Sequence, residues 1–302
     1  MELDFNTVVI GAGVAGMTAA IYLKRSNIDV VMLEKSAPGG QINRTSDIEN
    51  YPGFAHIDGP DLAMNMFNQV TALGVTYKYG DVSIIEDHQD YKSIITDQGT
   101  INCKNIILAS GRRPRELGLA KEKELIGRGI SYCAICDGPL YRNKIVLVVG
   151  GGNSAVEETQ YLSDIAEKVY LVHRGTSFRA DPVEQERLFK KTNVEILYNS
   201  NVVELLDEGK KLHGVVVNTD GKPTTINVDA MFICVGSDPE TSFLKSLQIE
   251  MDAGYVIVDK RMATNIKGIY ACGDVIKKDV YQISTAIGDA AIAALSIKKD
   301  MQ

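Results

Sequence analysis

The fold is decided by the stretch Thr7-Val8-Val9-Ile10-Gly11-Ala12-Gly13-Val14-Ala15-Gly16. Its apolar start predicts a buried strand over residues 7–10, and helical spacing follows over residues 17–25. Between them, Gly11, Gly13 and Gly16 form the pattern G-x-G-x-x-G. Glycines at this spacing let the backbone approach a pyrophosphate, which the unpaired N–H groups of a helix N-terminus attract.

The next apolar strand strengthens this interpretation. It covers residues 30–33 and ends in Glu34, which lies 23 positions after Gly11. A carboxylate at this place can hold a ribose hydroxyl, and it would repel a 2′-phosphate. Strand, glycines, helix, strand and acid together are a far more specific signal than the glycines alone, and they predict an NAD- or FAD-type site.

The same order of elements occurs again in the middle of the chain. A strand over residues 145–149 precedes the glycines, and a helix over residues 156–165 and a strand over residues 169–172 follow them. The pattern here is G-x-G-x-x-A. The candidate nucleotide-binding residues of this second unit are Gly150, Gly152, Asn153 and Ser154.

The second unit ends its last strand in basic rather than acidic residues. His173 and Arg174 stand where the first unit has Glu34, and Arg179 follows five positions later. Arginines would pair with a 2′-phosphate, which predicts an NADP-type site, although they could also form a solvated basic face. Two nicotinamide sites would make little chemical sense, so the first site is better assigned to FAD, which takes a hydride and passes electrons onward.

The end of the chain supplies a further candidate for the first site. A strand over residues 268–274 closes on Gly273 and Asp274, and an Ala-rich helix is expected over residues 282–296. Asp274 can reach a ribityl hydroxyl there, or the segment is a tight turn before an ordinary helix.

This order of motifs sets the predicted organisation. We expect an α/β protein with two Rossmann-like dinucleotide-binding domains, the second inserted in the first. The FAD-binding domain takes residues 1–112 and 240–302, and the NADPH-binding domain takes residues 113–239. Two crossing segments, at residues 108–114 and 234–239, each end an apolar strand in Gly and then Pro, which suits a bend.

A pair of closely spaced cysteines lies in the central domain, in Cys133-Ala134-Ile135-Cys136-Asp137-Gly138. Such a pair can close a small disulfide ring and be redox-active, whereas zinc would usually need two more ligands, and a fortuitous pair is the third alternative. Asp137 could supply a proton to this chemistry or simply cap a turn. The remaining cysteines, at positions 103, 234 and 272, are predicted to be buried small hydrophobes.

The bulk composition excludes several classes of protein. The chain has 302 residues, and its net charge of −7 argues against nucleic acid as the main partner. The acidic start lacks the pattern of a signal peptide, and no apolar run is long enough to cross a membrane. We therefore expect a cytoplasmic protein.

Taken together, these motifs resemble the bacterial low-molecular-weight thioredoxin reductase family over nearly the whole chain. The resemblance is carried by residues 11–16, 39–41, 49–53, 131–138, 150–158 and 271–274. It implies FAD and NADPH as cofactors, thioredoxin as the partner, a homodimer, and a large rotation of the central domain. Metal is not expected.

The resemblance also implies roles for single residues. Gln41 and Asn50 should contact the flavin, Asp274 should hold the ribityl chain, and Gln282 should lie by the ring. Gly40 and Gly273 are cofactor-binding candidates from the same motifs. For the dithiol, the family implies that Cys136 faces the flavin, that Cys133 attacks the thioredoxin disulfide, and that Asp137 is the acid.

One position departs from the family pattern. The family has a second arginine after His173 and Arg174, and this chain has Gly175. Loss of one charged contact would cost on the order of 1–3 kcal/mol in binding. Two arginines remain, so NADPH stays the expected donor, with a weaker preference over NADH. Open alternatives are ferredoxin as the donor, another thioredoxin-like protein as the partner, and a redox-sensing flavoprotein that does not turn over.

Overall fold

The computed structural model describes residues 3–44 and 48–302, and the chain divides into two compact units. Unit 1 comprises residues 3–43, Tyr51–Arg113 and Asp238–Gln302. Unit 2 comprises Pro114–Ser237 together with the described residues 44 and 48–50. The chain passes between the units through β7 (Arg112–Pro114) and β16 (Ser237–Pro239), which pair with each other.

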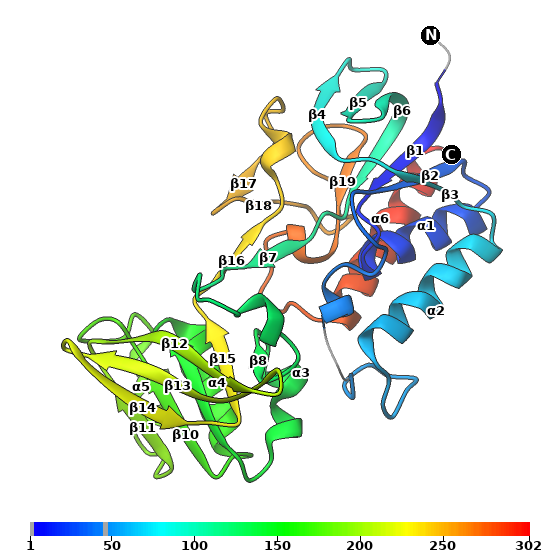
Figure 1. Ribbon diagram of the computed structural model, residues 1–302. Coiled ribbons are helices and arrows are strands. Elements are labelled where there is room, and N and C mark those ends of the chain that lie inside the picture. Colours follow the sequence, from blue (N-terminus) through cyan, green and yellow to red (C-terminus); the bar gives the residue numbers. More distant parts are fainter. Residues whose placement is uncertain (1–2, 45–47) are drawn as a thin grey trace. The chain divides into compact units, whose positions relative to one another are not determined.

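Unit 1 is built on a seven-stranded sheet in the order β3-β2-β1-β6-β5-β4, with β19 also paired to β6 (Figure 1). Its strands are β1 (Phe5–Ile10), β2 (Val30–Glu34), β3 (Thr76–Tyr79), β4 (Val82–Asp87), β5 (Lys92–Thr96), β6 (Gly99–Leu108) and β19 (Ile269–Ala271). Strands β3, β2, β1, β6 and β19 run parallel, and β4 and β5 add an antiparallel extension. Ile10 aligns with both Leu33 and Leu108, so three strands end together at one edge of the sheet.

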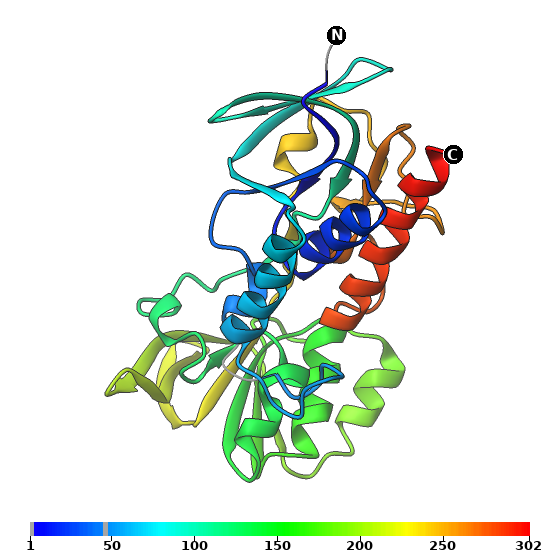
Figure 2. The same cartoon turned by 90° about the vertical axis from the view of Figure 1, so that its right-hand side faces the viewer.

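Helices cover one face of this sheet. They are α1 (Val14–Arg25), α2 (Gly59–Ala72) and α6 (Ile283–Asp300). In Figure 2, α1 (blue) lies between α2 (cyan) and α6 (red), and it contacts both. Buried side chains such as Met17, Leu23 and Ile297 fill the space between helices and sheet.

The opposite face packs against irregular segments. These include the 3-10 helices η4 (Ser242–Leu244) and η5 (Gly273–Val275) and the short pair β17 (Met251–Asp252) and β18 (Tyr255–Val256). Leu244 and Val256 are fully buried there against Leu108. A further 3-10 helix of unit 1, η1 (Gly40–Arg44), follows the loop after β2.

Unit 2 repeats the plan with a five-stranded parallel sheet in the order β11-β10-β9-β15-β8. Its strands are β8 (Ile130–Ser131), β9 (Ile145–Gly150), β10 (Lys168–Val172), β11 (Val194–Leu197) and β15 (Ala230–Cys234). The helices are α3 (Ala134–Asp137), α4 (Asn153–Ser163), α5 (Pro182–Leu188), and the 3-10 helices η2 (Lys123–Leu125) and η3 (Gly138–Tyr141). An antiparallel sheet of β12 (Ser200–Glu208), β13 (Lys211–Thr219) and β14 (Lys222–Asn227) supplies the apolar side chains on the other face.

The predicted α/β class, with two Rossmann-like units and the second inserted in the first, is confirmed. Both glycine-associated helices begin earlier than predicted, at Val14 and Asn153, because the helix starts directly after the glycine turn. The last helix runs on to Asp300. In the described part of the chain, no helix combines the length and apolarity needed to span a membrane.

Candidate active site

The first glycine turn joins the end of β1 to the start of α1. Glu34 is fixed beside it, because its carboxylate accepts the Ala12 N–H at 2.8 Å and both the N–H and the hydroxyl of Ser36 at 2.9 Å. Gly13 caps α1 without a side-chain hydrogen bond from the described residues, and a Cβ built on it would meet nothing within 4 Å. The turn thus presents helix N–H groups to open space next to an oriented acid, which fits a pyrophosphate and an adjoining ribose.

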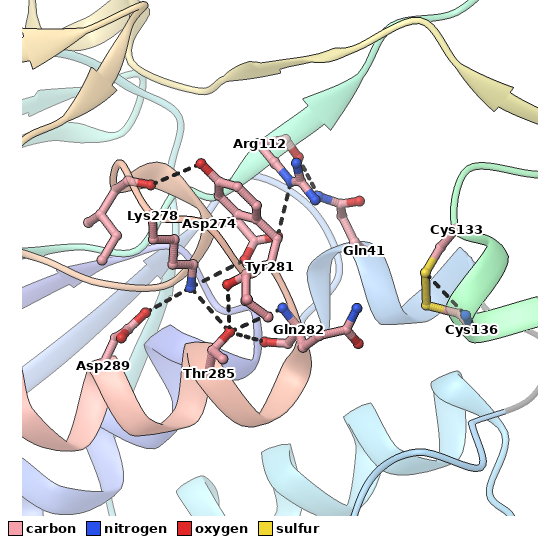
Figure 3. Close-up of polar contacts among 12 residues, drawn as sticks. Gln41, Arg112, Cys133, Cys136, Asp274, Lys278, Tyr281, Gln282, Thr285 and Asp289 are labelled. Carbon is pink, nitrogen blue, oxygen red and sulfur yellow. Dashed lines mark hydrogen bonds and ion pairs between the residues drawn. A yellow bond between two sulfur atoms is a disulfide. The ribbon is translucent and has the colours of Figure 1, made fainter. Parts of the chain in front are cut away.

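Asp274 lies in η5 between two cations (Figure 3). Its carboxylate is 3.3 Å from Nε of Arg112 and 3.8 Å from Nζ of Lys278. Lys278 is only 13% exposed and also pairs with Asp289 at 2.8 Å. These contacts fix the orientation of Asp274, the predicted ribityl contact, from two sides.

Arg112 connects Asp274 to the predicted residue Gln41 and to the ring of Tyr281 (Figure 3). Its guanidinium lies 3.9 Å from the centre of the Tyr281 ring, and its carbonyl accepts the side-chain amide of Gln41 at 2.5 Å. Burial raises the pKa of Tyr281 above its ordinary value, so this phenol stays neutral near pH 7. The next residue, Gln282, directs its backbone N–H to Thr285 Oγ1 at the start of α6.

The predicted residues Gln41, Asp274 and Gln282 all lie in unit 1, and their roles stay predictions. Arg112, which contacts Gln41 and Asp274, and Tyr281, which packs on Arg112, were not predicted as site residues. Arg112 was seen only as part of a crossing segment, and its partner Asp274 is 162 positions away. The predicted flavin residue Asn50 groups with unit 2 rather than with Gln41. Its role therefore stays a prediction.

The two cysteines of the central pair are joined in a disulfide, with their Cα atoms 5.3 Å apart. Cys133 immediately precedes α3, and its sulfur accepts the N–H of Cys136 at 3.2 Å (Figure 3). Ser131 Oγ accepts the N–H of Cys133 at 3.1 Å and holds the chain before the helix. Both sulfurs are bonded to each other, which is the state that the redox-active interpretation of the pair requires.

Asp137 ends α3, next to this disulfide. Its charge acts on Tyr141 in η3, whose pKa is raised to about 12 by burial first and by Asp137 second. Tyr141 therefore remains protonated at physiological pH. The predicted role of Asp137 as a proton donor stays a prediction.

The second glycine turn has the same form as the first. Gly152 caps α4 without a side-chain hydrogen bond from the described residues, and a Cβ built on it would again meet nothing within 4 Å. Asn153 exchanges two hydrogen bonds with Asp181, at 2.8 and 3.0 Å, and so ties the turn to the start of α5. Ser154 is exposed in the first turn of α4. This open turn fits a second pyrophosphate.

His173 lies inside the structure, 8% exposed, and links the glycine turn to the basic loop. Its Nδ1 is 3.1 Å from the Gly150 carbonyl, and its Nε2 is 2.9 Å from the Ser177 carbonyl. The loop is also held by the Arg179 N–H, which donates to the Gly151 carbonyl at 2.8 Å. The ring thus shapes the loop, whereas the side chains of Arg174 and Arg179 are exposed and available to a ligand.

Comparison with known proteins identifies the family. Residues 5–290 match the family described as pyridine nucleotide-disulphide oxidoreductase. The chain is 44% identical to the thioredoxin reductase of Listeria monocytogenes over 300 residues, which is 99% of this chain and 94% of the relative. The chain belongs to the thioredoxin reductase family. It is 40% identical to the thioredoxin reductase of Bacillus subtilis over 299 residues, covering 98% of this chain and 95% of that one.

A solved structure agrees with this family. The crystal structure of thioredoxin reductase from Streptococcus pyogenes superimposes with a TM-score of 0.94 at 43% identity, covering 98% of each chain. Membership confirms the predicted family and makes the protein a flavin- and pyridine nucleotide-dependent oxidoreductase. The disulfide and the second glycine turn both lie in unit 2.

Proposed function

We propose that the protein is an NADPH-dependent thioredoxin reductase, in which unit 1 binds FAD, unit 2 binds NADPH, and the Cys133–Cys136 disulfide reduces thioredoxin. The observation that carries this proposal is the Cys133–Cys136 disulfide, in a chain that also has two glycine turns open enough for dinucleotides. The thioredoxin reductase relatives support it over the whole length of the chain.

FAD, when bound, accepts a hydride from a nicotinamide and passes the electron pair to a disulfide. In unit 1, the N–H groups at Gly13 bind the pyrophosphate and Glu34 holds the ribose. Asp274, kept in place by Arg112 and Lys278, orients the ribityl chain. Gly11, Gly16, Gly40 and Gly273 shape the backbone around these groups, and Gln41, Asn50 and Gln282 contact the ring.

In unit 2, the open turn at Gly152 binds the pyrophosphate of NADPH, and Arg174 and Arg179 pair with its 2′-phosphate. His173 contributes by holding the loop that carries both arginines against the turn. The missing second arginine at Gly175 lowers the preference for NADPH over NADH without removing it.

The dithiol carries the electron pair to the protein substrate. Two electrons and two protons open the Cys133–Cys136 bond to two thiols. The Cys133 thiolate then attacks the thioredoxin disulfide and forms a mixed disulfide, and Cys136 attacks Cys133 Sγ to release thioredoxin with both of its sulfurs reduced. Asp137 supplies a proton in this sequence.

The test is an anaerobic titration of the FAD-loaded protein, in which NADPH and NADH are compared by the bleaching of the flavin absorbance. We expect bleaching at lower concentration with NADPH, and thiol release only when oxidised thioredoxin from the same organism is added. Equal efficiency of NADPH and NADH would overturn the NADPH assignment. Rapid NADPH oxidation without reduction of any such thioredoxin would overturn the substrate assignment.

A second donor assignment is favoured by one observation, the glycine at position 175. NADH would then bleach the flavin at least as efficiently as NADPH, whereas the intact Gly150-Gly151-Gly152 and Arg174 argue against ferredoxin as the donor. The homodimer implied by the family resemblance and the cytoplasmic location expected from the sequence are further parts of the proposal. Analytical ultracentrifugation checks the dimer, for which a sedimenting mass near twice that of the 32.9 kDa chain is expected.

A further inference from the structure

Glu158 is an acidic side chain of α4 that contacts the redox loop. Its Oε2 accepts the backbone N–H of Ala134 at 3.2 Å. Ala134 is fully buried, and the peptide group that carries this N–H joins it to Cys133. A carboxylate is therefore hydrogen-bonded to the backbone directly beside one of the two redox sulfurs.

The same oxygen has a second partner. The thiol of Cys234, at the end of β15, donates to Glu158 Oε2 at 3.0 Å. Burial, with the charge of Glu158 adding to it, raises the pKa of Cys234 well above its ordinary value. The thiol therefore stays protonated and acts as a lasting donor. Cys234 was predicted to be a buried small hydrophobe; the residue as a whole is partly exposed, its thiol is desolvated, and the contact that the thiol makes is polar.

We propose that Glu158 is a positioning residue for the dithiol, held by Cys234, whose carboxylate fixes the backbone at Ala134 and whose charge opposes conversion of the reduced Cys133 to a thiolate. This inference rests on the proposed function of the pair. It gives α4 and β15 a part in setting the reactivity of the dithiol.

The physical effect has a defined direction. A negative charge near a thiol disfavours the thiolate and raises the pKa of that thiol. At separations of about 6–8 Å and an effective dielectric of about 20–40, the shift is on the order of one pH unit. If Glu158 acted only as the acceptor for the Ala134 N–H and not through its charge, replacing it with glutamine would leave the pH dependence of the Cys133 reactivity unchanged.

Other groups near the loop have to be kept constant. Asp137 lies on α3 itself, and Tyr141 follows in η3 with its pKa raised to about 12. On the other side, Tyr132 donates its hydroxyl to the buried Glu122 at 2.8 Å. All four remain in a Glu158→Gln variant, so a changed profile there belongs to Glu158.

The test is anaerobic alkylation of the reduced, FAD-loaded protein by iodoacetamide as a function of pH. Glu158→Gln keeps an oxygen for the Ala134 N–H and removes the charge, while Glu157→Gln removes the same charge from the exposed neighbouring position. We expect the midpoint of the Glu158→Gln profile to lie lower by about 0.5–1.5 pH units, so alkylation below the midpoint is about 3- to 30-fold faster. Glu157→Gln should match the wild type.

The alkylation signal comes from the dithiol. Burial raises the pKa of Cys103 to about 12 and that of Cys272 further, so neither thiol reacts at moderate pH. A Cys234→Ser background removes the remaining thiol and keeps a donor to Glu158. Coincident midpoints for wild type and Glu158→Gln, or an equal shift in Glu157→Gln, would overturn the proposal.

A second measurement does not depend on the folding of Glu158→Gln. Cys234→Ser keeps a donor that holds the Glu158 carboxylate against the Ala134 N–H, and Cys234→Ala does not. Hydrogen exchange of the Ala134 amide should therefore be at least threefold faster in Cys234→Ala than in Cys234→Ser. Equal exchange would remove Cys234 from the proposal. Neither assay uses NADPH or thioredoxin, so failure of the proposed function and failure of this inference are separate results.

Discussion

Gly175, where the family has an arginine, is placed so that even one methyl group would disturb the structure. An ideal Cβ there would lie 2.9 Å from Nε2 of His173. The ring cannot move away easily, because on its other side a Cβ at Gly151 would lie only 2.1 Å from Nδ1. The His173 ring therefore lies tightly packed between two glycines, and Gly175→Ala would push it toward the second glycine turn at Gly151.

The expected cost of Gly175→Ala is the difference of two effects. Overpacking of this kind costs about 1–3 kcal/mol. Gly175 does not have a positive φ, so alanine fits the folded backbone without strain. Alanine then stabilises the protein by about 0.4–1 kcal/mol, because it restricts the unfolded chain. The net destabilisation is therefore about 1.3 kcal/mol, within limits of about 0 and 2.6 kcal/mol, which lowers the melting temperature of unit 2 by a few degrees.

Differential scanning calorimetry of a double-mutant cycle isolates the contact. In a His173→Ala background, Gly175→Ala should instead stabilise the protein by about 0.4–1 kcal/mol, because the atom that it meets is gone and only the effect on the unfolded chain remains. Gly288→Ala in α6 serves as the control, since a Cβ there meets nothing within 4 Å and should raise stability. If Gly175→Ala still lowers the melting temperature in the His173→Ala background, the contact between position 175 and His173 is not the cause of the destabilisation. A Gly175→Ala protein with the melting temperature of the wild type would also refute this reasoning.

Three further results are expected. Cys136→Ser should still allow NADPH to bleach the flavin but should abolish thioredoxin reduction in a coupled assay, and retained turnover would remove the dithiol from the pathway. Arg174→Ala should raise the KM for NADPH about 5- to 150-fold while leaving that for NADH nearly unchanged in steady-state kinetics, because one charged contact is lost. Burial acts to raise the pKa of Asp87, but hydrogen bonds from Lys92 and the Gln89 N–H outweigh it, so the pKa is lowered. Asp87 therefore stabilises unit 1 above its unfolded-state pKa of about 3.9, and urea unfolding should show the gap between wild type and Asp87→Asn closing as pH falls below about 4. A gap of the same size at pH 6 and pH 3 would contradict this reasoning.

The sequence was most informative where a few neighbouring residues determine a structure. Both glycine turns and the cysteine pair are local patterns, and the structure has an open turn at Gly13 and at Gly152 and a disulfide at the pair. Helix starts were misplaced by three residues because the turn itself, rather than the apolar spacing, begins each helix. The three-stranded sheet of β12, β13 and β14 was not predicted, because its alternating pattern lies outside the motifs.

Long-range contacts were beyond the reach of sequence patterns. Arg112 and Asp274 meet because β6 and β19, the sheet strands that precede them, end side by side with Leu108 aligned to Ala271, and no spacing in the sequence signals that contact. His173 was predicted to bind the nucleotide because it precedes Arg174. In the structure its ring lies between the Gly150 and Ser177 carbonyls, which no sequence motif signals, and its role toward the nucleotide stays a prediction. The roles of the site residues remain predictions for the experiments above.

Helix α4 contacts both candidate functional parts of unit 2, the second glycine turn and the Cys133–Cys136 disulfide. The N-terminus of α4 forms the open turn at Gly152, and Glu158 on the same helix holds the backbone beside Cys133. From Asn153 to Glu158 the helix rises about 7.5 Å, over a hydrogen-bonded segment that does not stretch. The nucleotide turn and the disulfide are therefore fixed to one rigid element and cannot exchange places by rearrangement within unit 2. If both must reach the flavin in turn, unit 2 has to move as a body on the two crossing strands, which gives a physical reason for the rotation expected from the family resemblance.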